Sequence, residues 1–195
     1  MRRSHGGLSG LVLCLIVGLG ACSTGGPDYR HITDAGVVAD GGIRIEASAG
    51  EASTLNPILA SDSASADLCG LVFNGLVRYG PKLTLEGDLA RSWAVKDGGR
   101  VIVFHLRPGV LWQDGAPFTS ADARFTVERI LDPKVASPLK SGFDLVQSMA
   151  TPDPLTLVVR YKKPYAPALE AWGLGILPRH LLEGKDINTA AFNRD

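Results

Sequence analysis

The stretch from Trp93 to Phe125 constrains the fold most, because it sets two Asp-Gly turns beside a strand-like run and a capped helix start. Asp97-Gly98-Gly99 supplies residues that tolerate positive φ, which predicts a tight turn between strands. The flanking residues, 92–96 and 100–107, are strand-like, and the second run is rich in β-branched and aromatic side chains. We therefore expect a hairpin. Both faces of its second strand are largely apolar, which predicts cover on both sides.

A helix is predicted to begin at Thr119, after breaks at Pro108-Gly109 and Asp114-Gly115. Thr119 can cap the backbone N–H of Asp122, whose carboxylate lies favourably near the positive end of the helix dipole. Asp132-Pro133 marks the expected end. Apolar residues at i, i+4, i+7 and i+8 would form one buried face: Ala123, Val127, Ile130 and Leu131.

The rest of the chain mixes strands and helices without regular βαβ units, which predicts an α+β fold with a mixed or antiparallel sheet and flanking helices. Strands are expected over 43–47, 76–79, 83–85 and 155–161, with a turn over 151–154. Helices are expected over 64–73, 166–172 and 176–182, the first with Leu68, Leu71 and Val72 on one side.

The N-terminus has the pattern of a lipoprotein signal peptide over residues 1–21. Arg2 and Arg3 precede an apolar run over 11–17, too short for a membrane span of about 20 apolar residues. The run ends in Leu-Gly-Ala-Cys, which is typical of a lipobox and predicts that Cys22 carries lipid. The alternative is an ordinary secretory signal with an incidental cysteine. Residues 22–40 then predict a flexible tether, and the folded domain is expected over 41–195.

Cysteine usage agrees with a covalent anchor. Cys14 would leave with the signal peptide and Cys22 would be consumed by lipid. Cys69 then remains alone in the mature chain, which leaves no internal disulfide and predicts a buried, apolar role for this side chain.

Composition and motifs exclude several classes of function. The 20 basic and 20 acidic residues balance, and no basic stripe indicates nucleic-acid binding. No hydrolase motif is present, although a dispersed catalytic triad leaves an exported hydrolase as an alternative. His105 has no second ligand at metal spacing, so no metal or other cofactor is expected. Trp93 and Trp112 are interpreted as packing residues, with ligand contact as the alternative.

Several short motifs, taken in order, resemble the family 5 extracellular solute-binding proteins. They are Thr54-Leu55-Asn56-Pro57, Gly75-Leu76-Val77, Leu89-Ala90-Arg91-Ser92-Trp93, then His105-Leu106-Arg107 with Trp112, Asp114-Gly115 and Asp122, and finally Leu177-Pro178-Arg179-His180. No single motif is specific, but their order and spacing are. The resemblance covers essentially residues 41–195.

The resemblance implies part of the N-terminal lobe of a two-lobe, periplasmic-binding-protein-like fold (type II, cluster C). Members continue beyond the point that corresponds to Asp195, so we expect an N-terminal fragment with exposed apolar surface where later segments pack. The implied function is the substrate-binding component of an ABC importer, capturing oligopeptides and delivering them to a permease and its ATPase subunits. Alternatives on the same scaffold are a nickel complex, haem, an opine or a sugar. The implied location is the cell envelope, lipid-anchored on the periplasmic side of the inner or outer membrane.

The best candidates for the ligand-binding cleft lie on the polar loop after the first predicted strand, since loops on rigid scaffolds carry function. The alternative is that Asn56-Pro57 merely forms a turn. The candidate residues are Glu51, Ser53, Thr54, Leu55 and Asn56.

Overall fold

The structure is a computed structural model that describes residues 50–194. These residues lie in the second of the two compact units of the chain, Glu46–Asp195. The predicted signal peptide, Cys22, the tether over 22–40 and the strand over 43–47 fall outside the described residues. Across residues 50–194, no helix combines the length and apolar character needed to cross a membrane.

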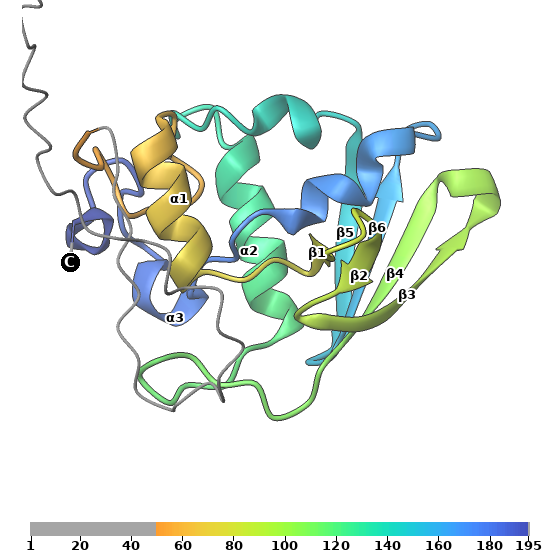
Figure 1. Ribbon diagram of the computed structural model, residues 1–195. Coiled ribbons are helices and arrows are strands. Elements are labelled where there is room, and N and C mark those ends of the chain that lie inside the picture. Colours follow the sequence, from red (N-terminus) through yellow and green to blue (C-terminus); the bar gives the residue numbers. More distant parts are fainter. Residues whose placement is uncertain (1–49, 195) are drawn as a thin grey trace, which may run out of the picture. The chain divides into compact units, whose positions relative to one another are not determined.

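The predicted hairpin is present and forms one side of the main sheet (Figure 1). β3 (Ala90–Lys96) runs antiparallel to β4 (Val101–Leu106), with Trp93 opposite Phe104. The three residues of the turn, 97–99, have φ values of 51°, 62° and 92°, in the left-handed region that glycine adopts without steric cost. The prediction drawn from Asp-Gly-Gly is therefore confirmed.

Two further strands complete this sheet, in the order β3-β4-β6-β5. β6 (Thr156–Tyr161) was predicted, and β5 (Val146–Asp153) was not. The turn expected over 151–154 is wrong for its first three residues, which belong to β5. No residue of β5 is fully buried, so its sequence lacks the alternation that marks a half-buried strand. Pro152 is tolerated because β5 is an edge strand of the described sheet.

The helix α2 (Ser120–Leu131) packs against β5 and β6 (Figure 1). Thr119 and Asp122 form a capping box at its start, and Asp132 ends it, as predicted. Ala123, Val127 and Ile130 have no exposed surface. The predicted apolar face is therefore the one that covers the sheet.

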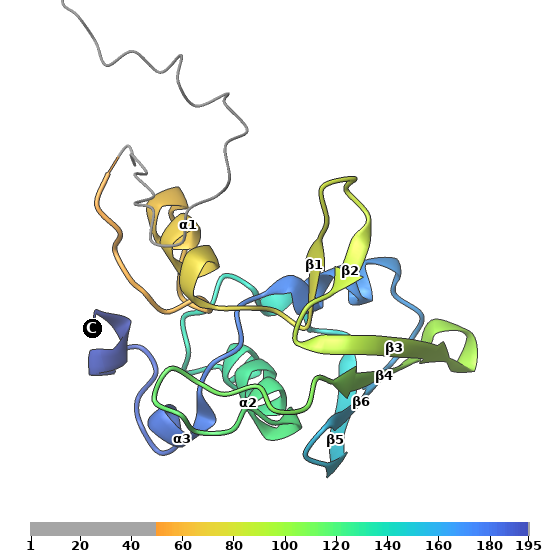
Figure 2. The ribbon, with the colours of Figure 1, turned by 60° about the horizontal axis from the view of Figure 1, so that its bottom comes forward.

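The remaining elements are short. Residues expected to form a helix over 166–172 form two 3₁₀ turns instead. The β1–β2 hairpin stands away from the main sheet (Figure 2). Every strand pair among residues 50–194 is antiparallel, so the α+β class holds with the antiparallel of the two expected sheet forms. The bounds are α1 Ser63–Val72, β1 Val77–Tyr79, β2 Leu85–Gly87 and α3 Arg179–Leu182, with 3₁₀ turns at Asp97–Gly99, Lys140–Gly142, Ala166–Ala168, Glu170–Gly173 and Ala191–Asn193.

The centre of the core is Trp172, which has no exposed surface. Its ring lies 5.2 Å from that of Phe104 and 5.5 Å, edge-on, from that of Phe143. Its indole N–H donates to the hydroxyl of Tyr161 at 3.0 Å. Burial raises the pKa of Tyr161 to about 12, so this hydroxyl stays neutral and keeps the proton that it donates to the backbone oxygen of Ala168 at 3.5 Å. Tyr161 thus ties β6 to the turn that carries Trp172.

One expectation about burial needs correction. The inward face of β4 is buried, but Val103 and His105 on the other face are only half-buried, so the strand is not fully covered on both sides. Leu68, Leu71 and Val72 of α1 are 41%, 52% and 52% exposed. The residues of α1 that are buried are small: Ala64, Ser65 and Cys69. Cys69 is free and buried, as predicted.

Candidate functional site

The predicted binding loop, Glu51–Asn56, leads into α1 and borders a cavity. This cavity has a volume of about 550 Å³, and Ser53 and Thr54 line it. Leu55 lines a separate apolar hollow of about 110 Å³ together with Cys69 and Phe192. Asn56 is buried, and Glu51 is exposed. The structure therefore brings two of the five candidates to the cavity.

The other walls of the cavity come from parts of the chain that no sequence motif singled out. They include the segment after α2 and the segment near the end of the described residues. Their small and amide side chains carry no recognisable spacing, and only the fold brings them next to the loop. The lining residues are Leu59, Ala136, Asn188, Thr189, Ala190, Ala191, Asn193 and Arg194.

Both polar groups of the Asn56 side chain form hydrogen bonds within the protein. Its side-chain oxygen accepts from the backbone N–H of Ile58 at 3.2 Å, which closes a local turn. Its side-chain nitrogen donates to the side-chain oxygen of Asn193 at 2.9 Å, in a fully buried contact. Asn56 forms the turn that the alternative interpretation expects, and a ligand-binding role for the loop as a whole stays a prediction.

Asn193 holds the loop from 137 residues away. Its backbone oxygen accepts from the N–H of Leu55 at 2.8 Å and from the hydroxyl of Thr54 at 3.4 Å. Its side-chain nitrogen donates to the backbone oxygen of Ile187 at 2.9 Å. A buried amide with every group paired is rigidly oriented, so Asn193 fixes the loop against the end segment.

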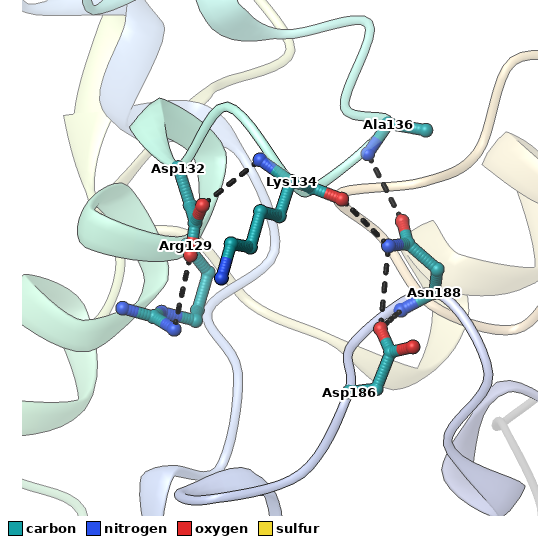
Figure 3. A network of polar contacts seen from close by, with 6 residues as sticks. All are labelled: Arg129, Asp132, Lys134, Ala136, Asp186 and Asn188. Carbon is teal, nitrogen blue, oxygen red and sulfur yellow. Dashed lines mark hydrogen bonds and ion pairs between the residues drawn. The ribbon is translucent and has the colours of Figure 1, made fainter.

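Asn188 joins two further walls of the cavity (Figure 3). Its side-chain oxygen accepts from the N–H of Ala136 at 3.0 Å, and its side-chain nitrogen donates to the backbone oxygen of Lys134 at 2.8 Å. Asp186 accepts from the backbone N–H of Asn188 at 3.0 Å. The side-chain amide of Asn188 thus pairs with one backbone N–H and one backbone C=O of the segment after α2, as a peptide group of an adjacent strand would.

On its other side the loop is tied to the start of α1. The Ser53 hydroxyl donates to one oxygen of Asp62 at 2.6 Å, and the Ser65 hydroxyl donates to the same oxygen at 2.7 Å. The N–H of Ser65 donates to the other oxygen at 2.8 Å. The Ser53 hydrogen bond, followed by those from Ser65, lowers the pKa of Asp62 from 3.8 to about 2.

We expect Ser53→Ala to raise the pKa of Asp62 from about 2 toward 3.8, because the largest single stabilisation of the carboxylate is removed. Since the folded-state pKa is lowered, ionised Asp62 stabilises the fold above about pH 3.8, and this contribution is lost as the pH falls through about 2. NMR titration of the Asp62 side chain measures the shift. Ser61→Ala is the control, and an unchanged pKa in Ser53→Ala would contradict the assignment.

The aromatic residues singled out by the sequence lie in packed surroundings. Trp93 is half-buried against the core, and Trp112 meets Phe118 edge-to-face at 6.0 Å. The indole nitrogen of Trp112 is buried, without a hydrogen-bond partner in the described part of the chain. A ring nitrogen of His180 lies 2.6 Å from the carboxylate of Asp114, which lowers the pKa of Asp114. No group of three potential metal ligands occurs within residues 50–194.

An apolar patch is exposed on α1 and the neighbouring loop. Leu68, Leu71 and Val72 lie on α1, and Leu111 is 62% exposed. Val72 and Leu111 line one small pocket of about 70 Å³, so the patch continues from the helix to the loop.

The sequence model "Bacterial extracellular solute-binding proteins, family 5 Middle" matches residues 84–191. The chain belongs to this family. The match covers the main sheet, α2 and α3, and it ends within the segment that lines the cavity.

Three relatives show the extent of the similarity. Protein XP55 of Streptomyces lividans is 35% identical over 148 residues, which cover 75% of this chain and 27% of the relative. The structure of NikZ from Campylobacter jejuni with Ni(L-His) has a TM-score of 0.69 at 35% identity, over 74% of this chain and 29% of that one. The oligopeptide-binding protein AppA of Bacillus subtilis, solved with a nonapeptide, has a TM-score of 0.71 at 25% identity, over 75% and 30%. The chain thus spans under a third of each.

Proposed function

We propose that this chain is part of the substrate-binding component of an ABC importer that captures oligopeptides outside the inner membrane. The observation that carries the proposal is the family match over residues 84–191, on a fold similar to that of a peptide-bound relative. The partners are then a peptide, a permease and its ATPase subunits. Capture and delivery need binding and no bond cleavage, so we propose a receptor rather than a hydrolase.

The cavity beside Ser53 and Thr54 is the proposed ligand contact within this chain. Its volume of about 550 Å³ lies within the range of small-molecule sites, roughly 300–1,000 Å³. Its walls come from three separated segments, which Asn193 joins through a buried hydrogen bond and Asn188 through exposed ones. Such cross-linking pre-organises a site, and a pre-organised site loses less entropy when it binds.

The alternative is a non-peptide solute on the same scaffold. The similarity to NikZ, solved with Ni(L-His), favours a small metal chelate as the second candidate. A chelate brings its own metal ligands, so a receptor for it needs no metal-binding cluster of its own.

Binding of both candidates can be measured on the full chain. We expect saturable retention of short peptides from a mixed library by the immobilised protein, measured by mass spectrometry, and no saturable binding of nickel–histidine by calorimetry. Binding of nickel–histidine without binding of peptides would contradict the peptide proposal and support the metal chelate as the ligand. Binding of neither would overturn both.

We also propose that the chain is held at the membrane through lipid on Cys22, on the periplasmic side of the inner or outer membrane. The support is the lipobox sequence before Cys22 and the extracellular character of the family. Metabolic labelling with a tagged fatty acid tests this. Label on the protein that persists in Cys22→Ser would contradict it.

A further inference from the structure

The backbone N–H groups of the binding loop from Ser53 to Asn56 are already used in hydrogen bonds within the protein. Those of Ser53 and Thr54 both donate to the hydroxyl oxygen of Ser65, at 2.9 and 3.1 Å. The N–H of Leu55 donates to the backbone oxygen of Asn193 at 2.8 Å. The N–H of Asn56 donates to the hydroxyl oxygen of Thr54 at 3.1 Å.

The same holds for the residues that follow. After Pro57, which has no N–H, Ile58 donates to the side-chain oxygen of Asn56 at 3.2 Å. Leu59 and Ala60 donate to the backbone oxygen of Asn56 at 3.0 and 3.1 Å. Every backbone donor from Ser53 to Ala60 therefore has a partner inside the protein.

The hydroxyl groups of Ser53 and Thr54 also donate hydrogen bonds to acceptors within the protein. The Ser53 hydroxyl donates to Asp62 at 2.6 Å, and the Thr54 hydroxyl donates to the backbone oxygen of Asn193 at 3.4 Å. Freeing one of these hydroxyl groups for a ligand would break its present hydrogen bond, which contributes about 0.5–3 kcal/mol. A ligand carboxylate therefore finds no free donor between Ser53 and Ala60.

Glu51 adds a negative charge at the start of the loop. Its side chain is exposed, so a ligand can reach it. A positively charged group near Glu51 gains a favourable ionic contact, and a carboxylate is repelled. Glu51 is not among the residues that line the cavity beside Ser53 and Thr54, whereas Arg194 is, and the cationic side chain of Arg194 could meet a ligand's negative end.

We infer that the loop Glu51–Asn56 binds the hydrogen-bond donor end of its ligand, a protonated amine, and disfavours a carboxylate. This inference rests on the proposed function and specifies the chemistry and orientation of the ligand at this one loop. It predicts that a peptide places its amino end toward Glu51.

The test uses the full chain, immobilised, and two peptide pools. One is a pool of random tripeptides without lysine and arginine, so that the terminal amine is the only ammonium group, and the other is the same pool after N-acetylation. We expect the free-amine pool to be retained at least tenfold more. Glu51→Gln should lower this ratio by about threefold, the effect of losing one exposed ionic contact.

Glu86→Gln is the matched control. It removes the same charge from an exposed position on β2, which both ribbon views place well apart from the loop (Figures 1 and 2). The ratio should then be unchanged. Equal retention of both pools by the unmodified chain, or an unchanged ratio in Glu51→Gln, would overturn the inference while leaving the receptor proposal standing. Retention of neither pool would overturn the peptide proposal and this inference together.

Discussion

Trp172→Ala is expected to lower the free energy of unfolding by about 3–5 kcal/mol, the range for removing a large buried aromatic side chain. The side chain is fully buried, packs on the rings of Phe104 and Phe143, and donates to Tyr161. A small domain has only about 5–15 kcal/mol of stability in total. Urea denaturation followed by circular dichroism measures the change.

Two further variants make this result interpretable. Trp93→Ala truncates a half-buried tryptophan at the sheet edge, so its loss should be clearly smaller. Tyr161→Phe keeps the ring but leaves the indole N–H of Trp172 unpaired, which should cost about 1–3 kcal/mol. If Trp172→Ala does not fold, Tyr161→Phe still tests the contact. Losses for Trp172→Ala no larger than for Trp93→Ala would contradict the central role of Trp172.

Asp122→Ala is expected to destabilise the fold by about 3 kcal/mol, since it removes both a helix cap and a tertiary contact. One carboxylate oxygen accepts from the N–H and the hydroxyl of Thr119, at 2.8 and 3.1 Å. The other accepts from the N–H of Arg179 at 3.0 Å. Asp122 therefore fixes the start of α2 and the start of α3 together. Thermal and urea unfolding measure the loss.

Glu128→Ala serves as the control on the same helix. Its side chain is 40% exposed and pairs with Arg124, so the expected loss is within about 0.5 kcal/mol. Asp122→Asn should fall between the two, because it keeps one acceptor oxygen but turns an N–H₂ group toward one set of donors. A loss for Asp122→Ala as small as that for Glu128→Ala would show that the buried contacts are not stabilising.

The parts of the fold that the sequence predicted correctly are those set by neighbouring residues. The turn at 97–99 follows from residues that accept positive φ. The start of α2 follows from Thr119 and Asp122, and its buried face from side chains spaced by one helical turn. Each of these signals lies within a few residues of the structure that it determines.

The candidate site was predictable only in part, for a physical reason. The polarity of Glu51–Asn56 marked a loop, but the partners of that loop are Ser65 on α1 and Asn193, far along the chain. A hydrogen bond across 137 residues leaves no periodic pattern in the sequence. The structure also changed the role expected of the predicted candidates. The Asn56 side chain forms hydrogen bonds within the protein, and the backbone N–H groups of Ser53 and Thr54 are already bonded to Ser65.

Other positions acquired their role only in the folded chain. Gly75 appeared in the sequence as part of a short family motif, and the helix before it ends at Val72. A Cβ atom at Gly75 would lie 2.7 Å from the backbone of Gly173, so the residue is small because two segments approach closely. Leu68 and Leu71 have the apolar character of core residues and are exposed.

The sequence by itself determined the family, the α+β class, the central hairpin and the capped helix, because local conformational preferences and the order of short motifs encode them. Only the tertiary structure decided which side chains enclose the cavity. It alone showed that the backbone N–H groups from Ser53 to Ala60 already donate hydrogen bonds within the protein. That result depends on contacts between distant residues, since Ser65 and Asn193 meet the loop only after the chain has folded.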